Sequence, residues 1–385
     1  MGAQMTQRIA ALAAGAAVAV LVLSGCAPET GARDRGESAA QRQAFPAVYE
    51  QSVEWRECDS SLGYRDGVEE LLTEQGARVD GMRCALVDVP LDWNDPENPE
   101  TIRLSTVRVP ATGDEPIGTL LSNPGGPGAS GIDFALGMTI QESFAAVQEH
   151  YDLLGFDPRG MGRSTPLECE SESTIFELEL AMCADQDPLA SSMGSAQVAR
   201  DMELLRHLVG DDTMHYPGFS YGTVIGASYA TIFPERVGRL LLDSAWPSDW
   251  SSPLGSYEQH AAISGALAEL LAQCGVEYEV AACPMGGEDA LVQTMQQLTA
   301  QPLTATDGTR VDGDMLSGYL TMSLYRLPAG REDALDAVGR ALGGEQQAVD
   351  DIAAAMSGGG ARVSLSGMVV RCLSAPRDAN PVGLV

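Results

Sequence analysis

Short apolar runs alternate with amphipathic segments between about residue 84 and residue 246. Apolar runs bounded by turn residues are typical of buried strands, whereas apolar residues at i, i+4, i+7 and i+10 mark one face of a helix. The predicted strands span residues 85–93, 101–111, 117–123, 151–157, 214–219 and 237–243, and the predicted helices span residues 196–209 and 223–233. This alternation favours the α/β class, with a mostly parallel sheet covered by helices on both faces.

The pattern changes after residue 246, because residues 247–365 contain helix-like segments and no convincing strand. We interpret this stretch as a helical cap on the sheet. Its predicted helices lie at residues 258–274, 286–300 and 331–342. The apolar positions of residues 366–385 are interpreted as the restart of the sheet in a truncated C-terminal core segment. The predicted core therefore spans residues 44–246.

The first 26 residues have the features of an export signal. Arg8 precedes an apolar run over residues 9–23, and "LSGC" follows with Cys26 at its end. A charged end, a short apolar core and small residues before a cleavage point are typical of a secretory signal, and "LSGC" resembles the lipobox of bacterial lipoproteins. A transmembrane anchor is the alternative, but the run is shorter than the ~20 residues that a span needs. We expect an exported chain that is lipid-anchored through Cys26 or secreted, with residues 27–43 as a flexible polar tether.

Charge excludes some classes of function. The chain carries 23 basic and 54 acidic residues, a net charge of −31, so we expect no nucleic-acid partner. All the basic residues are arginines, which excludes a Ser-Lys dyad, a lysine Schiff base and a P-loop lysine.

Seven cysteines follow Cys26, and export would place them in an oxidising compartment. Neighbours in the sequence suggest three pairs and leave Cys372 over, although spacing alone does not fix the connectivity. The suggested pairs are Cys58 with Cys84, Cys169 with Cys183, and Cys274 with Cys283. The spacings do not fit a zinc site, and no metal or cofactor is expected.

The candidate nucleophile is Ser220, in the pentapeptide "GFSYG" of residues 218–222. This stretch fits G-x-S-x-G, in which a serine stands on a strained strand-to-helix turn that leaves no room for side chains two residues away. The motif alone is weak evidence, but here a strand-like run precedes it and a helix-like run follows. Pro217 is unusual in such a strand because it lacks an N–H group.

Two glycine-rich loops accompany this motif. "NPGGPG", at residues 123–128, directly follows a predicted strand, where backbone N–H groups can hold the oxyanion of an acyl-transfer intermediate. Gly126 is the expected donor and Tyr221 the second, while an ordinary turn is the alternative reading. "GFDPRGMGRS", at residues 155–164, predicts a structured loop with a supporting Arg/Asp pair.

These motifs, in this order and spacing, resemble the secreted α/β-hydrolase exopeptidases of the tripeptidyl-aminopeptidase and proline-iminopeptidase type. The resemblance runs from about residue 55 to residue 385 and includes "YATIFPERVGRLLLDSAWP" at residues 229–247. It implies an α/β-hydrolase core with a helical cap, Ser220 as nucleophile, and peptide substrates with a free N-terminus.

The general base is the missing element. Catalytic residues of this fold follow the order Ser, Asp, His, and the chain has four histidines: His150, His207, His215 and His260. His150 and His207 precede the serine and are interpreted as surface residues near helix ends, and His260 belongs to the cap. His215 lies five residues before Ser220 on the same strand, roughly 16 Å away at ~3.3 Å per residue. Asp243 is either an acid beside the nucleophile or a structural residue at a strand end.

The resemblance implies that the acid and base come from a segment beyond the cap. We therefore interpret the chain as truncated, with impaired activity as a serine peptidase. The alternatives are an esterase-like α/β hydrolase, a surface lipoprotein that binds peptides without cleaving them, and a gene fragment.

Overall fold

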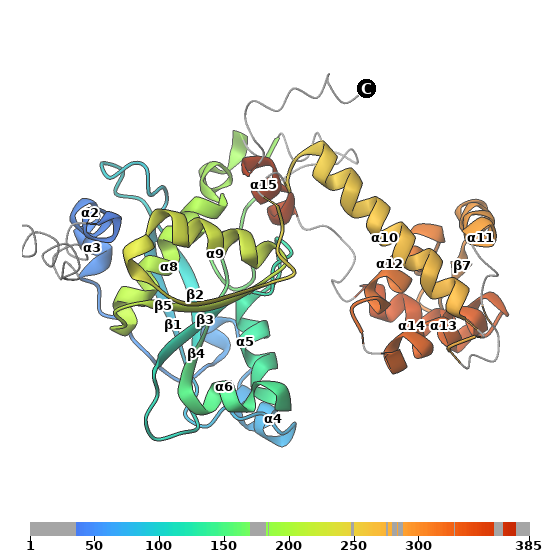
Figure 1. Cartoon of the computed structure of the whole chain (residues 1–385), viewed down its shortest axis with the longest axis horizontal. Coiled ribbons are helices and arrows are strands. Elements are labelled where there is room, and N and C mark those ends of the chain that lie inside the picture. The colour runs from blue at the N-terminus through green and yellow to red at the C-terminus, as the bar shows by residue number, and fades with distance from the viewer. Residues whose placement is uncertain are drawn as a thin grey trace, which may run out of the picture. The chain divides into compact units, whose positions relative to one another are not determined.

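The computed structural model describes residues 36–169, 182–183, 185–247, 250–274, 276–278, 283, 288–326, 328–357 and 365–374. The chain divides into two compact units. We call the first the sheet unit; its described residues are 36–125, 129–166 and 195–244. The second, the helical unit, comprises the described residues among 126–128, 167–194 and 245–374. Figure 1 labels the elements of both.

The sheet unit is built around a six-stranded sheet with the order β1-β2-β4-β3-β5-β6. Its strands are β1 (Arg83–Pro90), β2 (Thr101–Val109), β3 (Gly118–Ser122), β4 (Tyr151–Phe156), β5 (Met214–Phe219) and β6 (Val237–Asp243). The β1–β2 and β2–β4 pairs are antiparallel, whereas β4–β3, β3–β5 and β5–β6 are parallel. All six predicted strands are therefore confirmed, and the sheet is mostly parallel.

Helices cover both faces of this sheet. They are α5 (Gly131–Ile140), α6 (Ala145–His150), α8 (Ser195–Val209) and α9 (Tyr221–Ile232). A Cβ atom placed on Gly226 of α9 would lie 2.6 Å from a methyl carbon of Leu242, so that side chain faces α9. The neighbouring Leu241 lines a groove with Met138 and Phe144, from the α5–α6 side. This alternation follows from the two-residue period of a strand.

The predicted tether is wrong for residues 37–43, because α2 (Glu37–Ala44) and α3 (Pro46–Tyr49) pack on the sheet unit. Ser38 and Gln41 are buried although they are polar. The Ser38 hydroxyl donates to Glu203 Oε1 at 2.5 Å, and the Gln41 amide donates to Tyr49 Oη at 2.9 Å. Buried polar groups are tolerated when they are hydrogen-bonded, which explains why a polar stretch is ordered here.

Shorter helices complete the sheet unit in sequence order. They are η2 (Ser60–Leu62), α4 (Val68–Glu74), η3 (Glu142–Phe144) and η5 (Pro234–Arg236).

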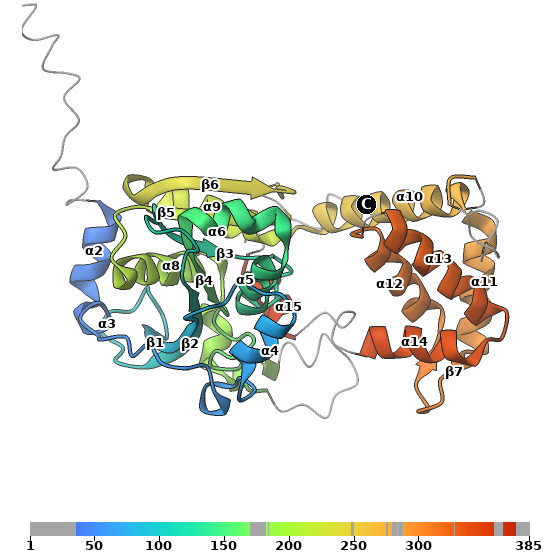
Figure 2. The ribbon, with the colours of Figure 1, turned by 90° about the horizontal axis from the view of Figure 1, so that it is seen from below.

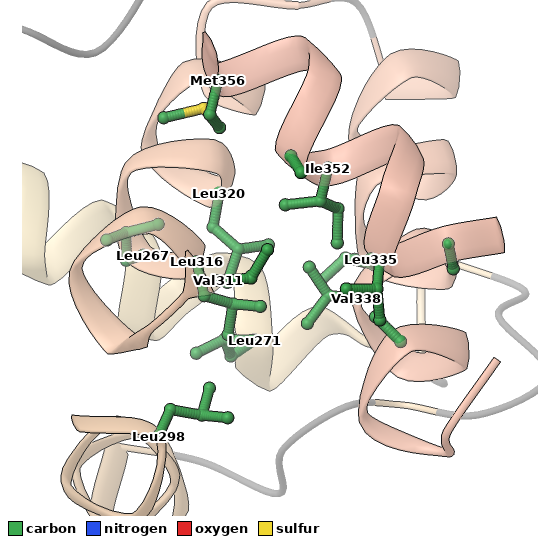
Figure 3. Close-up of a cluster of buried hydrophobic side chains, with 14 of the residues drawn as sticks. Leu267, Leu271, Leu298, Val311, Leu316, Leu320, Leu335, Val338, Ile352 and Met356 are labelled. Atoms are coloured by element: carbon green, nitrogen blue, oxygen red, sulfur yellow. The ribbon is translucent and has the colours of Figure 1, made fainter. Parts of the chain in front are cut away.

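The helical unit has a core of its own, which agrees with the predicted cap. It contains α10 (Pro253–Gln273), α11 (Glu288–Ala300), α12 (Gly313–Ser323), α13 (Pro328–Leu342) and α14 (Gln346–Ser357), with η4 (Pro188–Ser192). Figure 3 shows Leu316 and Leu320 of α12 in a cluster with Leu335 of α13 and Ile352 of α14. The prediction missed the short hairpin of β7 (Leu303–Thr304) and β8 (Arg310–Val311).

The predicted strand restart after the cap is wrong for residues 365–373, which form helix α15 (Leu365–Leu373). The adjacent valines at 369 and 370 suggested a strand, but they are buried as part of a helix with Gly367. The Arg371 guanidinium lies 5.3 Å from the ring centre of Trp250, and the Ser251 hydroxyl donates to the Ser374 carbonyl at 2.8 Å. These contacts fix α15 within the helical unit. Residues 375–385 of that prediction lie outside the described residues.

The three suggested disulfides are confirmed, and Cys372 is a free, exposed thiol. The predicted signal and the lipidation residue Cys26 lie outside the described residues. Within the described ranges, no helix combines the length and the apolar character needed to span a membrane.

Candidate active site

Ser220 stands between the end of β5 and the first residue of α9, as the motif predicts. Its backbone has φ 53° and ψ −122°, a conformation that L-residues other than glycine rarely adopt. Such strain costs of the order of 1–3 kcal/mol and persists where the surrounding structure enforces it. The Ser220 N–H donates to the carbonyl of Asp243, the last residue of β6, at 3.0 Å. The side chain is partly exposed, so a substrate carbonyl can reach it.

The two glycines of the motif are required by close packing. A Cβ atom on Gly218 would lie 2.5 Å from the Gly222 carbonyl oxygen, and one on Gly222 would lie 2.6 Å from the carbonyl oxygen of Asn123. Both distances are shorter than real carbon contacts, so a larger residue at either position would displace the turn. The buried Tyr216 hydroxyl also donates to the Gly222 carbonyl, at 2.8 Å.

The glycine-proline loop lies directly against this turn. A Cβ atom on Gly125 would lie 2.9 Å from the Tyr221 backbone nitrogen and 2.5 Å from the Phe219 carbonyl oxygen. The Gly125 N–H donates to the Asn123 side chain at 2.9 Å, which fixes the start of the loop. Gly126 follows with φ 110°, which also favours glycine. The predicted oxyanion donors are thus the residue after the nucleophile, Tyr221, and the residue after a glycine that contacts its amide.

Tyr221 begins α9, where the helix dipole favours negative charge. Its side chain is buried, and its hydroxyl forms a hydrogen bond of 2.9 Å with the Ser195 hydroxyl of α8. Burial raises the pKa of Tyr221, so the phenol stays neutral. The side chain therefore anchors the helix start, and only the backbone of this residue is a candidate for catalysis.

The 155–164 loop supports the site, as predicted, but its ion pair joins different residues from those of the motif. Arg159 and Asp201 of α8 are fully buried and form two hydrogen bonds, of 2.6 and 2.8 Å. Asp157 accepts from the Ser130 hydroxyl at 2.5 Å and from the Arg163 N–H at 2.8 Å. These bonds hold the loop against the start of α5 and leave neither carboxylate available as a catalytic acid.

No histidine of the sheet unit is bonded to the nucleophile in the described part of the chain. His215 lies in the first half of β5, and its Nδ1 accepts from the Arg239 N–H at 3.1 Å. His150 is exposed at the end of α6, while His207 of α8 is half-buried, with its ring centre 5.0 Å from that of Tyr49. Burial and neighbouring arginines lower the pKa values of His207 and His215, which agrees with packed, neutral rings. His260 lies on α10 of the helical unit.

Asp243 is exposed at the end of β6, and its carboxylate accepts from the Ser244 hydroxyl at 2.8 Å. Ser244 has φ 56°, a left-handed conformation that favours glycine. The sequence analysis missed Asn123, Tyr216 and the strained Ser244 as supports of the turn. Only the position of Asn123 beside the glycine-rich loop offered a signal for any of them.

Comparison with known proteins agrees with this geometry. Residues 118–260 match the model of the alpha/beta hydrolase fold family. The chain is 34% identical over 303 residues to serine protease Hip1 of Mycobacterium tuberculosis, a match that covers 72% of this chain and 53% of that protein. It is 33% identical over 194 residues to the tripeptidyl aminopeptidase of Streptomyces coelicolor, covering 42% of this chain and 35% of that protein.

A third relative, carboxylesterase B of Mycobacterium tuberculosis, is 30% identical over 233 residues, which cover 54% of this chain and 44% of that protein. The chain thus spans about half the length, or less, of these curated relatives. The sheet order, the turn at Ser220 and the family match agree, and the core of this chain is an α/β hydrolase.

Proposed function

We propose that this chain is a serine-type hydrolase that acts on peptides with a free N-terminus and releases short peptides or single residues. The observation that carries the proposal is the strained, partly exposed Ser220 at the junction of β5 and α9. Peptide substrates are supported by the relatives named serine protease and tripeptidyl aminopeptidase.

In this proposal the Ser220 hydroxyl attacks the scissile carbonyl carbon and loses its proton to a base. The C–N bond then breaks, and the amine leaves with a proton while the acyl group stays on Ser220. Water attacks this ester and releases the acid. The N–H groups of Tyr221 and Gly126 stabilise the negative oxygen in both steps.

Slow turnover is the second part of the proposal, because no histidine of the sheet unit is placed to take the proton. Enzymes of this type that lose a triad member keep only ~10³–10⁴-fold acceleration over water, from binding and the oxyanion hole. Attack by Ser220 would then depend on water as the proton acceptor. We further propose export and lipid attachment at Cys26, which radiolabelled glycerol or palmitate incorporation would test against Cys26→Ala.

The test is covalent labelling combined with turnover. A fluorophosphonate probe is expected to label the chain slowly but specifically, and Ser220→Ala should abolish labelling. Ser228→Ala is the matched control, because Ser228 lies on the same helix with its hydroxyl bonded to the Val224 carbonyl at 2.8 Å. Labelling that survives in Ser220→Ala would refute the nucleophile, and turnover of a tripeptidyl anilide at ordinary rates of ~1–10³ per second would refute the impairment.

An esterase-like hydrolase is the second candidate, favoured by the similarity to carboxylesterase B. The same turn and oxyanion donors serve esters, whose leaving groups need less protonation than amines. Parallel measurements on short acyl esters and on tripeptidyl anilides distinguish the two, since an esterase would cleave only the former. Binding of peptides without labelling of Ser220 would instead indicate a non-catalytic peptide-binding protein.

A further inference from the structure

The outer edge of β6 carries exposed apolar side chains. In Figure 2, β6 lies at one border of the sheet, and among the described residues no strand pairs with its outer side. Leu241 is 57% exposed and Leu242 is 37% exposed, on opposite faces of the strand. Edge strands present unpaired N–H and C=O groups and normally bear charges or prolines that prevent further pairing. Three consecutive leucines, Leu240 to Leu242, make β6 an unprotected edge.

An apolar groove of about 240 Å³ adjoins this edge. Its walls include Leu120, Met138, Phe144, Val147, Leu240 and Leu241. The groove lies on the α5–α6 side of the sheet, so an apolar side chain that enters it would also cover Leu241. Groove and edge together form one continuous apolar surface, of the kind that marks a binding site for another polypeptide segment.

The position of β6 defines what an added strand would bring. Asp243 ends β6, and its carbonyl accepts the Ser220 N–H at 3.0 Å. A strand that runs parallel to β6 would therefore end at the edge of the sheet where Ser220 stands. Residues just after such a strand would lie near the nucleophile, whereas an antiparallel strand would bring its first residues there.

A second copy of this chain fits the surface less well than a different segment. Two β6 strands related by a two-fold axis would run antiparallel, and a net charge of −31 repels a second copy. The relatives point to the other occupant, because serine protease Hip1 contains nearly as much chain outside the match as inside it.

We propose that the β6 edge and its groove bind a polypeptide segment made of a strand parallel to β6 and an amphipathic helix. This segment covers Leu241 and Leu242, and the residues after its strand bring a proton acceptor to Ser220. The second statement rests on the proposed function, whereas the first does not.

The probe is the portion of Mycobacterium tuberculosis serine protease Hip1 that lies outside the match, produced as a separate polypeptide. Titration into the full 385-residue chain, followed by calorimetry, is expected to show saturable binding that Leu241→Asp weakens at least about tenfold, equivalent to ~1.4 kcal/mol. Ile117→Asp is the matched control, because Ile117 is 51% exposed but does not line the groove. Ser220→Ala should bind as tightly as the unmodified chain.

Activity gives a separate readout. Binding should raise turnover of the anilide by at least ~10²-fold, the usual contribution of a general base, and Ser220→Ala should abolish that gain. Absence of binding, or binding that Leu241→Asp leaves intact, would overturn the docking surface. Binding without a gain in turnover would overturn the delivery of the proton acceptor, while self-association lost in Leu241→Asp would show that a second copy is the occupant.

Discussion

The two borders of the sheet differ in how their outer edges are protected. At β1, the Gln51 side chain forms two hydrogen bonds with the backbone of Asp88, and Arg56 exchanges two backbone hydrogen bonds with Cys84. The Cys58–Cys84 disulfide joins the same edge covalently. At β6, the outer positions are exposed leucines. One border is thus closed by the chain's own residues, whereas the other retains the features of an internal strand.

This difference indicates which parts of the fold are self-sufficient. The β1 side combines hydrogen bonds, a disulfide and a buried ion pair, because the Arg159 guanidinium donates to the Pro90 and Leu91 carbonyls at the end of β1. The β6 side carries the site, since its last residue bonds to Ser220. The candidate nucleophile therefore lies next to the less protected border of the sheet.

The largest effect should come from the ion pair behind the β1 border. Asp201→Ala leaves the fully buried Arg159 charge without its carboxylate and also removes the acceptor of the Trp93 indole N–H. We expect a loss of ~3–5 kcal/mol in the free energy of unfolding, measured by urea denaturation. The matched control is Asp336→Ala, in an exposed pair with Arg340, which should leave stability nearly unchanged. Equal effects of the two substitutions would contradict the proposed importance of the buried pair.

Removal of the disulfide should have the next largest effect. Cys58→Ser with Cys84→Ser opens a loop of 26 residues, for which chain entropy predicts a loss of ~3–4 kcal/mol. Thermal unfolding under non-reducing conditions measures it, with Cys372→Ser as the control because Cys372 is unpaired and exposed. If the control loses as much stability as the double variant, the β1 border does not depend on this covalent link.

The sheet and the nucleophile were predictable because both depend on local patterns. Each strand is a short apolar run next to a turn signal, and Ser220 lies in a motif whose glycines are required by contacts within a few residues. The same locality explains the correct disulfides, which join neighbours in the sequence. For these features, a window of the sequence contains the physical cause.

The errors arose where distant partners decide the structure. Residues 37–43 are polar, and their helix is held by Glu203, 165 residues from Ser38, so no local pattern announces it. In α15 the adjacent Val369 and Val370 favour a strand locally, but packing in the helical unit selects a helix. Ser244 carried no signal of its left-handed backbone, because that conformation depends on how β6 ends beside Ser220.

A smaller effect is expected at the end of β6. Ser244→Gly relieves a φ of 56°, and because glycine adopts this conformation freely we expect a gain of up to ~1 kcal/mol in the free energy of unfolding. The lost hydrogen bond to the Asp243 carboxylate is exposed and reduces this gain only slightly. Chemical denaturation measures the change, and Ser244→Ala is the control because it removes the hydroxyl but keeps the strain. A glycine variant less stable than the alanine variant would show that the backbone at residue 244 is not strained.

The smallest change in stability should come from Leu241→Asp, which tests the β6 border itself. Because Leu241 is 57% exposed, loss of its side chain should alter the free energy of unfolding by less than ~0.5 kcal/mol. The same substitution places a charge on the open edge, so aggregation on heating, followed by light scattering, should decrease. Ile117→Asp adds the same charge at an exposed position away from this border and should reduce aggregation less. If both variants behave alike, net charge rather than the open edge controls association, and β6 is no more adhesive than the rest of the surface.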